Sequence, residues 1–480
     1  MKSLEKTEQE EFSVAVPSVL NIELCKHLLR IDGQEDVAFA LYKPSIGVHR
    51  FTALLHRILL PEDGDRDVHG NVNIHASYFK RVCQIAASEG SGIALIHSHL
   101  GPGWQGMSID DIITEKSYSS PALTLTDVPF IGLTLGTDNT WSARIWEYSN
   151  GWFERNMAVI VRVVGKRLHP FYNDALLPPP SFKEIYKRTI SVWGVENHAR
   201  IARLRVGIIG LGSVGSIVAE SLARMGIERF TLVDFDEVQE HNLDRLLGAT
   251  IRDIGHNKAI IAQRQIIKSA TGNNPQVRVV LHGITEEEGY RNALDCDVLF
   301  SCVDRPWPRQ VLNHLAYNHL IPVIDGGIKV RFDIESGLFE GADWQAHTVG
   351  PERICLECIG QYKSADVDTE RAGMLDDPSY LEGLPKEHLF KTNENIFPFS
   401  MNLASLEVLQ FIEMVTGIGE VGGYYGTQRY AYNQGYIRLN DSLNCIKGCF
   451  YQSGIASGDS VFPAPTGIDY SAEKARKRQE

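Results

Sequence analysis

The spacing of apolar and polar residues predicts strands and one helix in the first third of the chain. Five apolar runs have the length and composition of strands, and a sixth run has helical spacing. The strand runs are VAFALY (37–42), RFTALLHRILL (50–60), Ile93–Ile96, FIGLTLG (130–136) and WSARIWEY (141–148), and the helix is Tyr78–Ser88. Residues 1–15 are expected to form a mobile tail. We therefore expect an α/β domain over residues 1–155.

Residues 156–180 lack this pattern and are expected to be a linker. They end in Leu-Leu-Pro-Pro-Pro (176–180), and a proline triplet makes a stiff spacer. We expect a second domain over residues 181–480.

The second domain opens with the most regular pattern of the chain. A short apolar run, Val206–Ile209, enters a glycine-rich turn, Gly210-Leu-Gly212-Ser-Val-Gly215. A helix with apolar residues at 214, 217, 218, 222 and 225 follows, and a second apolar strand ends in Asp234. This order predicts a nucleotide-binding βαβ unit, in which backbone N–H groups approach a phosphate and the acid binds a ribose hydroxyl. Taken alone, the pattern also fits a nicotinamide-dependent dehydrogenase.

Composition excludes several classes of protein. The chain has 480 residues, 43% of them hydrophobic, and a formal net charge of −13, so a nucleic-acid partner is not expected. No apolar run approaches the ~18 residues that a membrane span needs. The first residues lack the apolar core of a signal peptide. We expect a cytoplasmic protein without a membrane partner.

The first candidate site follows the strand at Ile93–Ile96. His97-Ser98-His99 precedes a glycine-rich loop and then Ser108-Ile-Asp-Asp111. Alternate residues of a strand point the same way, so both imidazoles can reach one metal ion. His97, His99 and Asp111 would leave a fourth position for water, as in a catalytic zinc site. The alternative is two core histidines beside a helix N-terminus, with Ser108 and Asp111 as a capping box. The spacing of all four residues favours the metal.

These residues resemble the motif of the JAB/MPN metallopeptidases, the JAMM family of deubiquitinases, over roughly residues 20–150. The resemblance implies a cytidine-deaminase-like α/β fold, a catalytic zinc ion on His97, His99 and Asp111, and an oxyanion-stabilising role for Ser108. It also implies an upstream glutamate as general base for the zinc-bound water. Glu35 is the best match and Glu62 the alternative.

The match to this family has two departures. The loop 100–107 between His99 and Ser108 is one residue longer than the family pattern, and Leu100 stands where proline is common. A loop can absorb one residue, so activity is still expected. Glu35 also has a simpler interpretation, that of a solvated loop acid.

The residues after Asp234 change the interpretation of the glycine-rich turn. Asp236 follows two positions later, Asn242-Leu-Asp-Arg245 comes next, and Lys258-Ala closes the set. This set resembles the MoeB/ThiF and ubiquitin-activating enzymes over roughly residues 181–455. The resemblance implies a Rossmann-like, doubly wound fold that uses ATP and magnesium to adenylate the C-terminal glycine of a ubiquitin-like or sulfur-carrier protein.

Roles for individual residues come from the same resemblance. Fixed cations are needed where charge develops on the phosphates. The implied nucleotide-binding set is Gly210, Gly212, Gly215, Asp234 on the ribose, Asp236, Asn242 on the triphosphate, Arg245 and Lys258 as the cations, Asp304 on the magnesium side, and Arg309. Arg188 is implied to reach the partner's ATP in a homodimer. Singly, these residues could be solvated helix charges or strand-end caps; together, in this order, they favour the ATP site. Leu246 and Arg305 depart from the family's glutamine and asparagine.

Four cysteines form two close pairs, Cys355-x-x-Cys358 and Cys445-x-x-x-Cys449. Four thiolates in this arrangement suit a closed, structural zinc site. The alternative is four buried thiols. The adenylating family carries a zinc clamp at this place, with one residue fewer in the second pair.

The expected acyl acceptor is missing. Ubiquitin-activating enzymes pass the glycine to a loop cysteine, and residues 359–400 contain none. The other cysteines, Cys25, Cys83, Cys296 and Cys302, are expected elsewhere or in the core. The enzyme therefore stops at the adenylate, passes it to a partner, or uses a hydroxyl, for which the candidates are Ser364, Thr369, Ser379 and Thr392. Residues 396–415 resemble the family's crossing helix, and SAEKARKRQE at the end is expected to be a charged tail.

The sequence thus predicts a fusion of a zinc isopeptidase and an adenylyltransferase. One half would process or remove a ubiquitin-like protein, and the other would adenylate its C-terminal glycine for transfer to a conjugating enzyme. Sulfur-carrier activation for cofactor or amino-acid synthesis is the alternative, because an acyl adenylate attacked by sulfide needs no enzyme thioester. An inactive JAMM fold that only docks the carrier also stays open.

Overall fold

The computed structural model describes residues 11–69, 71–181, 183–333, 336, 338–383, 395–417, 426–440, 444–460 and 466–479. The chain divides into two compact units. Unit 1 comprises the chain up to Pro178 with Asn318–Leu320 and Gly454–Phe462, and unit 2 comprises the remainder. Among the helices that are described, none is both long and apolar enough to span a bilayer.

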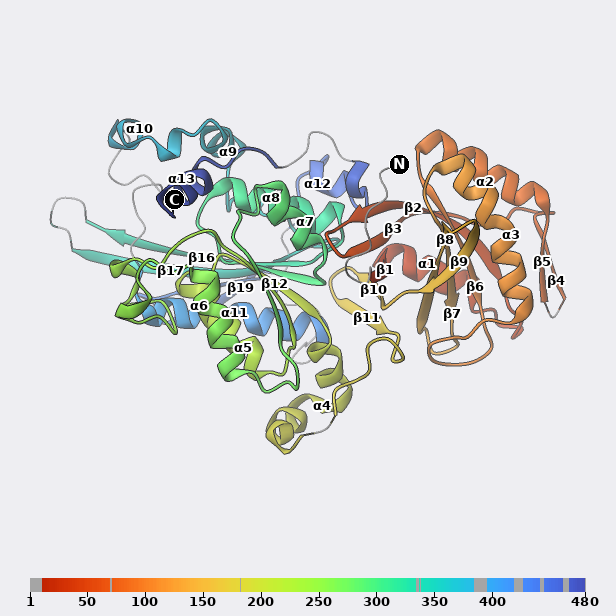
Figure 1. The fold of residues 1–480 in the computed structure, drawn as a ribbon, viewed down its shortest axis with the longest axis horizontal. Helices are drawn as coiled ribbons and strands as arrows, with labels where there is room; N and C mark the ends of the chain where they lie inside the picture. The colour runs from red at the N-terminus through yellow and green to blue at the C-terminus, as the bar shows by residue number, and fades with distance from the viewer. Residues whose placement is uncertain are drawn as a thin grey trace. The chain divides into compact units, whose positions relative to one another are not determined.

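Unit 1 is built on a mixed sheet whose described strands have the order β11-β10-β1-β3-β2-β6-β7-β8-β9 (Figure 1). These strands are β1 (Glu11–Pro17), β2 (Val37–Ile46), β3 (Arg50–Leu59), β6 (Gly92–Ser98), β7 (Phe130–Leu135), β8 (Trp141–Ser149), β9 (Trp152–Met157), β10 (Ile160–Val164) and β11 (Leu168–Tyr172). A separate hairpin pairs β4 (Arg66–His69) with β5 (Asn71–Ile74). The helices are α1 (Ser18–Leu28), α2 (Ala76–Glu89) and α3 (Ile109–Thr126).

The buried strand β2 shows how the sheet of unit 1 is covered on both faces. Ala38, Ala40 and Tyr42 pack in one cluster with Leu24 and Leu28 of α1. The alternate residues Val37, Phe39 and Leu41 pack in a second cluster with α2 and α3. Because successive side chains of a strand point to opposite faces, a continuous apolar run is required here. Figure 1 shows α2 and α3 side by side.

Two parts of unit 1 differ from the sequence-based expectation. The expected tail (1–15) contributes β1, which pairs in parallel with β3 and β10. The expected linker (156–180) contributes the end of β9 and both β10 and β11, which are strands of the sheet. The segment Ile160–Val164, including Arg162, is fully buried between its neighbours. The chain therefore leaves unit 1 only at the proline triplet, at Pro178.

Unit 2 contains a second sheet, with the order β14-β13-β12-β15-β16-β17-β18-β19 among its described strands. The strands are β12 (Arg205–Ile209), β13 (Arg229–Val233), β14 (Gln276–Val280), β15 (Val298–Ser301), β16 (Val323–Phe332), β17 (Phe339–Val349), β18 (Thr427–Ala431) and β19 (Tyr436–Asn440). The helices are α4 (Lys187–Ala202), α5 (Ser213–Arg224), α6 (Lys258–Ser269), α7 (Glu287–Leu294), α8 (Pro306–Asn318), α9 (Ser364–Arg371), α10 (Pro378–Gly383), α11 (Phe397–Thr416), α12 (Phe450–Ser453) and α13 (Tyr470–Gln479).

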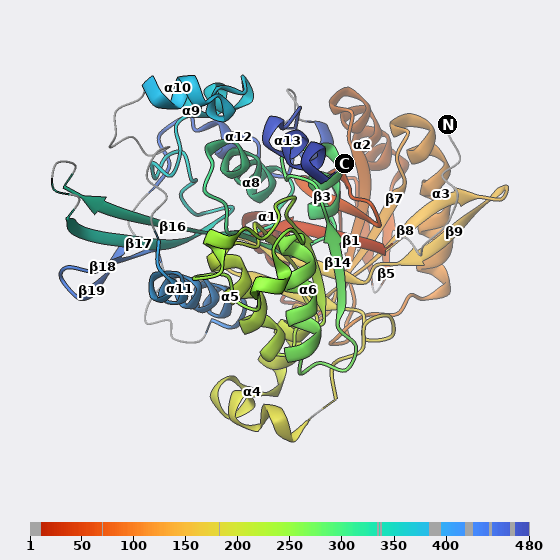
Figure 2. The ribbon, with the colours of Figure 1, turned by 60° about the vertical axis from the view of Figure 1, so that its left-hand side comes forward.

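The first five strands of this sheet are parallel and are covered on both faces. In Figure 1, α5, α6 and α11 lie below the sheet and α7 and α8 above it, and Figure 2 shows α11 beside α5. The strand order reverses direction between β12 and β15. The Rossmann-type fold predicted for this half is therefore present, and its switch point lies at the carboxyl ends of β12 and β15, where such sheets bind ligands.

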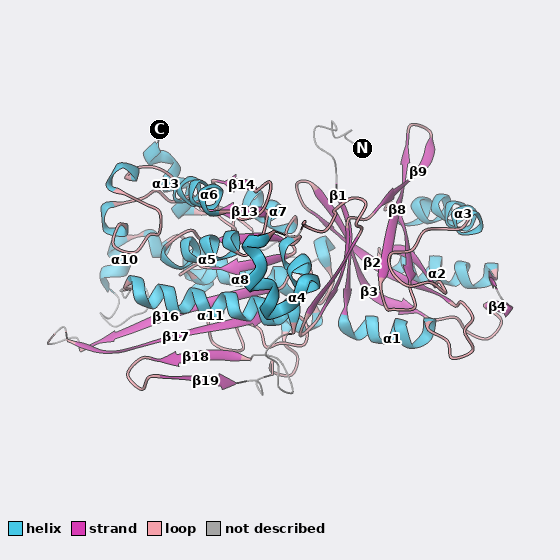
Figure 3. Cartoon of the chain, turned by 90° about the horizontal axis from the view of Figure 1, so that it is seen from below, coloured by secondary structure: helices cyan, strands magenta, loops and turns pink. Residues whose placement is uncertain are grey.

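Strands β17, β18 and β19 continue the sheet in the antiparallel sense (Figure 3). The predicted crossing helix is α11, whose buried residues pack on the extension formed by β16 and β17. The predicted charged tail is instead helix α13. It begins after Asp469, whose carboxylate accepts hydrogen bonds from the backbone N–H groups of Ser471 and Ala472. A capped first turn explains why a charged sequence forms a helix there.

Candidate functional sites

The two histidines of unit 1 lie at the end of β6 and face helix α3. Ile93 and Leu95 of β6 pack on the side of α2 and α3, so His97 and His99, at the same alternation, point that way. His97 Nε2 lies 3.1 Å from His99 Nε2, and Asp111 oxygens lie 3.6 Å and 3.3 Å from the two rings. Ligand atoms about 2.0 Å from a tetrahedral zinc ion would be about 3.3 Å apart. The three side chains therefore fit a zinc ion.

Ser108 and Asp111 also form the capping box that was the alternative interpretation. Ser108 Oγ accepts from the backbone N–H of Asp111 at 3.1 Å, and Asp111 Oδ2 accepts from the backbone N–H of Ser108 at 2.8 Å. The two interpretations are compatible, because the cap fixes the carboxylate of Asp111 toward His97 and His99. Burial opposes ionisation of Asp111, but its hydrogen bonds and the nearby histidines lower the pKa of the carboxyl below its usual range.

Glu35 lies in the irregular segment before β2, close to the metal cluster but outside it. Burial raises the pKa of Glu35, while His99 and Asp111 shift it in opposite directions, so the three groups interact. The alternative, Glu62, is 73% exposed in its side chain and lies 3.2 Å from Arg81. Of the two glutamates, only Glu35 interacts electrostatically with His99 and Asp111.

A buried ion pair that the sequence did not indicate lies beneath this cluster. Glu115 of α3, one turn after Asp111, binds Arg144 of β8, and both are almost fully buried. Arg144 Nη1 also donates to Thr134 Oγ1 at 2.6 Å. Burial and the positive charge of Arg144 lower the pKa of His97 to about 3. The pair fixes α3 against the sheet and favours the neutral, metal-binding form of His97.

The glycine-rich turn of unit 2 joins β12 to α5. Gly210 has φ +87°, and a β-carbon there would lie 2.6 Å from the carbonyl oxygen of Cys302. A β-carbon on Gly215 would collide with the carbonyl oxygen of Gly210, whereas one on Gly212 would meet nothing within 4 Å. Gly212 precedes the first residue of α5 and makes no side-chain cap. The open space at the helix N-terminus is where a phosphate would approach.

Asp234 directly follows β13 and is nearly buried beside the turn. Its Oδ2 accepts from the backbone N–H of Leu211 at 2.6 Å, and its Oδ1 accepts from the backbone N–H of Asp236 at 2.8 Å. Burial raises the pKa of Asp234 to about 6, against the opposing effect of Lys258. These bonds make Asp234 a strand-end cap and at the same time fix its oxygens at the glycine-rich turn.

Lys258 brings the remaining charges of this site together. Two hydrogen bonds join the ends of the loop from Asp236 to Lys258. The Lys258 N–H donates to Asp236 O at 2.9 Å, and Lys258 Nζ donates to Asp236 Oδ2 at 2.8 Å. Burial lowers the pKa of Lys258, but Asp234, Asp236 and Asp304 together raise it above its usual value. One partly buried ammonium therefore interacts with three carboxylates at the switch point.

The other predicted nucleotide-binding residues are engaged locally. Asn242 Oδ1 accepts from the backbone N–H of Gln239, and Arg245 donates to His241 O and to Asp244. Arg309 Nη2 donates to Gly326 O at 3.1 Å, and its Nε lies 3.3 Å from Asp325. Arg188 is exposed on α4. Asp234, Asp236 and Asp304 interact with Lys258, whereas the contacts of Asn242, Arg245 and Arg309 are with neighbouring residues of their own segments and of β16.

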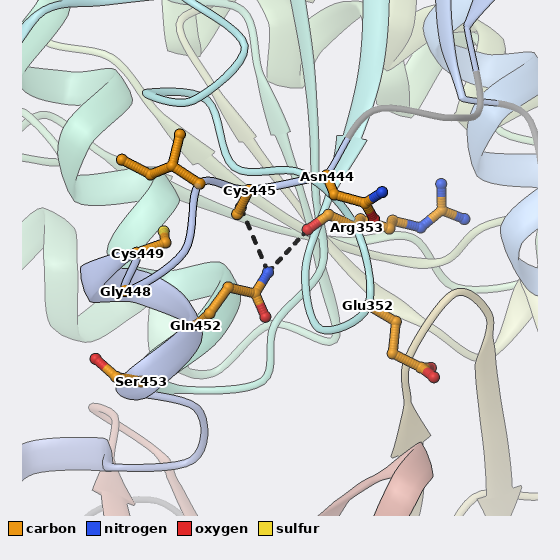
Figure 4. Close-up of a pocket in the computed structure, with 9 residues that line it drawn as sticks. Glu352, Arg353, Asn444, Cys445, Gly448, Cys449, Gln452 and Ser453 are labelled. Atoms are coloured by element: carbon orange, nitrogen blue, oxygen red, sulfur yellow. Dashed lines mark hydrogen bonds between the residues drawn. The ribbon is translucent and has the colours of Figure 1, made fainter.

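Cys355, Cys358, Cys445 and Cys449 form a second cluster that could hold a metal ion. The sulfur atoms of Cys355 and Cys449 are 3.8 Å apart. Thiolates bound at about 2.3 Å to a tetrahedral zinc ion would be about 3.8 Å apart. Cys445 and Cys449 also line a pocket of about 460 Å³ (Figure 4), in which Gln452 donates to Cys445 and to Arg353 O. The four residues therefore fit the structural zinc predicted from the sequence.

Comparison with known protein families decides the class of unit 2. The model of the ThiF family matches residues 186–442, more than half of the chain. The chain belongs to the ThiF family. The match begins after unit 1 and includes the glycine-rich turn, Lys258, Asp304 and the first cysteine pair.

Several curated relatives share this ThiF segment. Ubiquitin-like modifier-activating enzyme 5 of Drosophila willistoni is 30% identical over 28% of this chain and 35% of its own length. The probable adenylyltransferase/sulfurtransferase MoeZ of Mycobacterium tuberculosis is 28% identical over 47% of this chain and 51% of its own length. The sulfur carrier protein adenylyltransferase of Thermus thermophilus is 28% identical over 35% of this chain and 59% of its own length. The chain thus spans less than two thirds of each relative.

Solved structures are similar to a comparable share of the chain. A crystal structure of E. coli MccB with MccA-N7isoASN covers 56% of this chain and 75% of its own, at 17% identity and a TM-score of 0.43. A crystal structure of PaaA covers 54% and 82%, at 18% identity and a TM-score of 0.41.

The two departures from the ThiF pattern have clear local contacts. Leu246 is buried in a small apolar cluster with Val238 and Ile261, which fixes the loop that ends in Lys258. Arg305 binds Asp376 at 3.0 Å, so the residue beside Asp304 is tied to the segment after α9. Hydrophobic and ionic contacts replace the polar side chains that the family pattern contains.

The hydroxyl candidates for the acyl acceptor are engaged in local hydrogen bonds. Ser364 donates to Glu357, Thr369 donates to Ala365 O at 2.8 Å, and Ser379 donates to Asp377 at 2.8 Å. Thr392 lies outside the described residues. Ser364 thus bonds to a side chain seven residues earlier, Thr369 to the preceding turn of α9, and Ser379 to a carboxylate two residues earlier.

Sequence reasoning missed two buried acids of the ThiF half. Asp325, in the buried part of β16, and Glu407 of α11 are fully buried. Burial raises the pKa of both, and Cys302 donates a weak hydrogen bond to Glu407. A β-carbon on Gly326 would collide with Glu407. An acid and two glycines directly after an apolar run, in Ile321-Pro-Val-Ile324-Asp325-Gly-Gly, is the signal that could have indicated Asp325.

Proposed function

We propose that this chain is an adenylyltransferase that activates the C-terminal glycine of a ubiquitin-like or sulfur-carrier protein with ATP and magnesium. The observation that carries the proposal is the grouping of Gly210, Gly212, Asp234, Lys258 and Asp304 at the switch point of the sheet. The names of the relatives, an activating enzyme for a ubiquitin-like modifier and two adenylyltransferases, support the same activity.

Each residue of the site would have its own part in the adenylation. Backbone N–H groups at the start of α5 approach the phosphates, and Asp234 accepts from the ribose. A carboxylate oxygen of the carrier's glycine bonds to the α-phosphorus, the bond from that phosphorus to the β-phosphate oxygen breaks, and pyrophosphate leaves. Lys258 stabilises the charge that develops on the phosphates. Magnesium, when bound, would neutralise further charge, and Asp304 is the residue that would hold it.

Three further residues, Asn242, Arg245 and Arg188, would act only after a local change or in a dimer, whereas Arg309 would act from its present place. Asn242 and Arg245 reach the triphosphate once they leave their bonds to Gln239, His241 and Asp244. Arg309 stays on Asp325 and supports the strand end next to Asp304. In a homodimer, Arg188 would extend toward the nucleotide of the partner.

Pyrophosphate–ATP exchange and intact mass test this proposal. The chain, ATP and a candidate carrier should give a carrier adenylate, and Lys258→Gln should reduce exchange by at least about 100-fold. Lys268→Gln, at an exposed lysine of the same helix, is the matched control. Absence of exchange with every glycine-terminated carrier, together with binding of a nicotinamide cofactor, would return the site to the dehydrogenase class.

The fate of the adenylate separates two pathways. An adenylate alone indicates direct transfer to the acceptor. A thioester indicates transfer to a conjugating enzyme. An adduct that is sensitive to hydroxylamine but resistant to thiols indicates an oxyester. We favour ubiquitin-like conjugation, and sulfur transfer is the alternative. The absence of cysteine from residues 359–400 is compatible with both routes that bypass an enzyme thioester. Sulfide-dependent release of a thiocarboxylated carrier would decide for sulfur transfer.

We further propose that unit 1 is a JAMM-type zinc peptidase that trims or removes the same carrier. The tetrahedral spacing of His97, His99 and Asp111 supports it, as does the position of Glu35. Zinc, when bound, supplies a Lewis acid that activates water. Glu35 accepts the proton of the attacking water and returns it to the leaving amine, and the Ser108 hydroxyl donates to the oxyanion.

Cleavage of a carrier extended beyond its terminal glycine by a fluorescent peptide tests the peptidase. Glu35→Gln should abolish cleavage and retain zinc, because Glu35 is not one of the clustered ligands. Glu62→Gln, the exposed alternative, should cleave at the wild-type rate. A Glu35→Gln variant with normal cleavage would reject this choice of base, and a chain with no zinc on His97 would leave unit 1 as a docking module.

A further inference from the structure

Asp36, the residue after Glu35, is a buried carboxylate with donors from two separate segments. It is 1% exposed. It accepts from Arg66 of β4 at 2.5 and 2.7 Å, from Arg30 at 3.1 Å and from the backbone N–H of Val37 at 2.8 Å. Charge-assisted hydrogen bonds from two guanidinium groups fix a carboxylate much more firmly than water does. Asp36 therefore has one defined position.

The backbone of Asp36 is also bonded to the strand that carries the histidines. Its N–H donates to Ser98 Oγ at 3.0 Å, and its carbonyl accepts from the Ser98 N–H at 3.1 Å. The ladder between β2 and β6 ends at the pair Val37 and His97. A further backbone pair of this ladder would have bonded the Asp36 N–H, and the Ser98 side chain makes that hydrogen bond instead. Ser98 is 2% exposed and lies between the two histidines.

This bond bears directly on Glu35. Glu35 lies in a segment without regular structure, so no ladder of its own fixes the carboxylate. Its peptide bond to Asp36 contains the N–H that Ser98 Oγ accepts. A displacement of Asp36 would therefore move Glu35 relative to His99 and Asp111. Placing a reacting group about 1 Å away from its required position can cost about 100-fold in rate.

We propose that Asp36 and Ser98 form a clamp that positions Glu35 beside the His97–His99–Asp111 cluster. The clamp rests on the proposed peptidase function of unit 1. Both are positioning residues: Ser98 binds no metal ion, and Asp36 touches neither substrate nor metal. Arg66 extends the clamp to the hairpin of β4 and β5, since it holds the Asp36 carboxylate from that side.

Substitution of Ser98 tests the clamp in the full-length, metal-loaded protein. Ser98→Ala should lower kcat for the extended carrier about 10- to 100-fold. Its KM, and its affinity for cobalt used in place of zinc, should stay within about twofold of wild type. Ser98→Thr keeps the hydroxyl and should restore kcat to within about threefold. Ser13→Ala is the matched control, because Ser13 is also 2% exposed and bonded, to Thr52, away from the site.

Two additional readouts distinguish positioning from loss of structure. Hydrogen exchange at the Asp36 amide should accelerate in Ser98→Ala and not in Ser98→Thr, while exchange in α2 stays unchanged. Arg66→Gln should also lower kcat, as Ser98→Ala does. The visible spectrum of bound cobalt, which reports the metal ligands, should stay unchanged. A Ser98→Ala variant with wild-type kcat would overturn the clamp alone. A wild-type chain that binds no zinc in unit 1 and cleaves no carrier would overturn the peptidase and the clamp with it.

Discussion

Gly210, Gly212 and Gly215 belong to one turn but differ in what a β-carbon would meet. Gly210 and Gly215 are closed in by the backbone of Cys302 and of Gly210, whereas Gly212 faces open space with a negative φ of −74°. Gly212→Ala should therefore leave the Tm of unit 2 unchanged and lower ATP affinity at least about tenfold, because the methyl group occupies the phosphate approach. Gly215→Ala should lower the Tm itself. Calorimetry of binding and thermal unfolding separate the two effects; unchanged ATP affinity in Gly212→Ala would exclude a phosphate there.

His347 of β17 gives unit 2 an acid-sensitive residue. It is 1% exposed, Nε2 donates to Ile354 O and Nδ1 accepts from Thr427. Burial lowers its pKa to about 4, below the ~6.5 of an unfolded chain. The unfolded state then binds the proton more readily, so stability is complete above pH ~6.5 and falls by up to about 3 kcal/mol as the pH approaches 4.

Urea unfolding of unit 2 at pH 7 and pH 4.5 checks this. His347→Gln should lower stability at pH 7 but reduce the loss between the two pH values by about 2 kcal/mol. The exposed His241, as His241→Gln, is the control. An unchanged pH dependence in His347→Gln would place the acid sensitivity at other groups.

The sequence indicates individual site residues where several of them belong to one motif. Asp234 and Lys258 could be proposed as site residues because the glycine-rich turn and the Asn-Leu-x-Arg pattern fix their order along the chain. Glu115 and Arg144 were not found, because an isolated charge in a helix or strand pattern normally faces water. Only the folded chain brings α3 and β8 together and shows that the two charges neutralise each other in the interior.

At the scale of elements, the buried pair Glu115–Arg144 fixes helix α3. Arg144→Met removes one partner and leaves Glu115 as an unpaired buried charge, which costs about 3–5 kcal/mol. Chemical denaturation of unit 1 measures the loss, and the zinc affinity of His97, His99 and Asp111 should fall with it because α3 carries Asp111. Arg57→Met, which breaks an exposed pair with Glu89, should cost at most about 1 kcal/mol. A loss of the same size in both variants would show that burial does not decide the contribution.

Element prediction failed where a segment's partners are distant in sequence. β1 and β10 are short, and each is buried between two strands: β1 pairs with β3 and β10, and β10 pairs with β1 and β11. Locally, residues 11–17 resemble a tail and residues 160–164 a connector. α13 is similar: its charged sequence forms a helix because Arg476 binds Glu286 and Asp469 accepts from Thr285, groups almost two hundred residues away. By contrast, the β12–α5–β13 unit was predicted correctly because its contacts are local.

At the scale of the whole molecule, two clusters of different chemistry that could hold a metal ion lie one in each unit. The proposal predicts two zinc ions per chain, one on His97, His99 and Asp111 and one on the four cysteines. Cys358→Ser should remove one equivalent and lower the Tm of the ThiF unit, because a closed thiolate site contributes directly to folding. His99→Ala should remove the other equivalent, abolish carrier cleavage and leave pyrophosphate–ATP exchange unchanged.

Zinc content by atomic absorption, together with the two activities, decides among the alternatives. Two zinc ions per chain, one of them lost in Cys358→Ser and the other in His99→Ala, support two independent sites. One equivalent that Cys358→Ser removes would make unit 1 a metal-free docking module, since Asp111 would then serve only as the capping-box acid of α3. One equivalent that His99→Ala removes would leave the four cysteines as buried thiols, and the 3.8 Å separation of Cys355 and Cys449 would then need another cause. Because each variant touches one cluster, the stoichiometry assigns every ion to its unit.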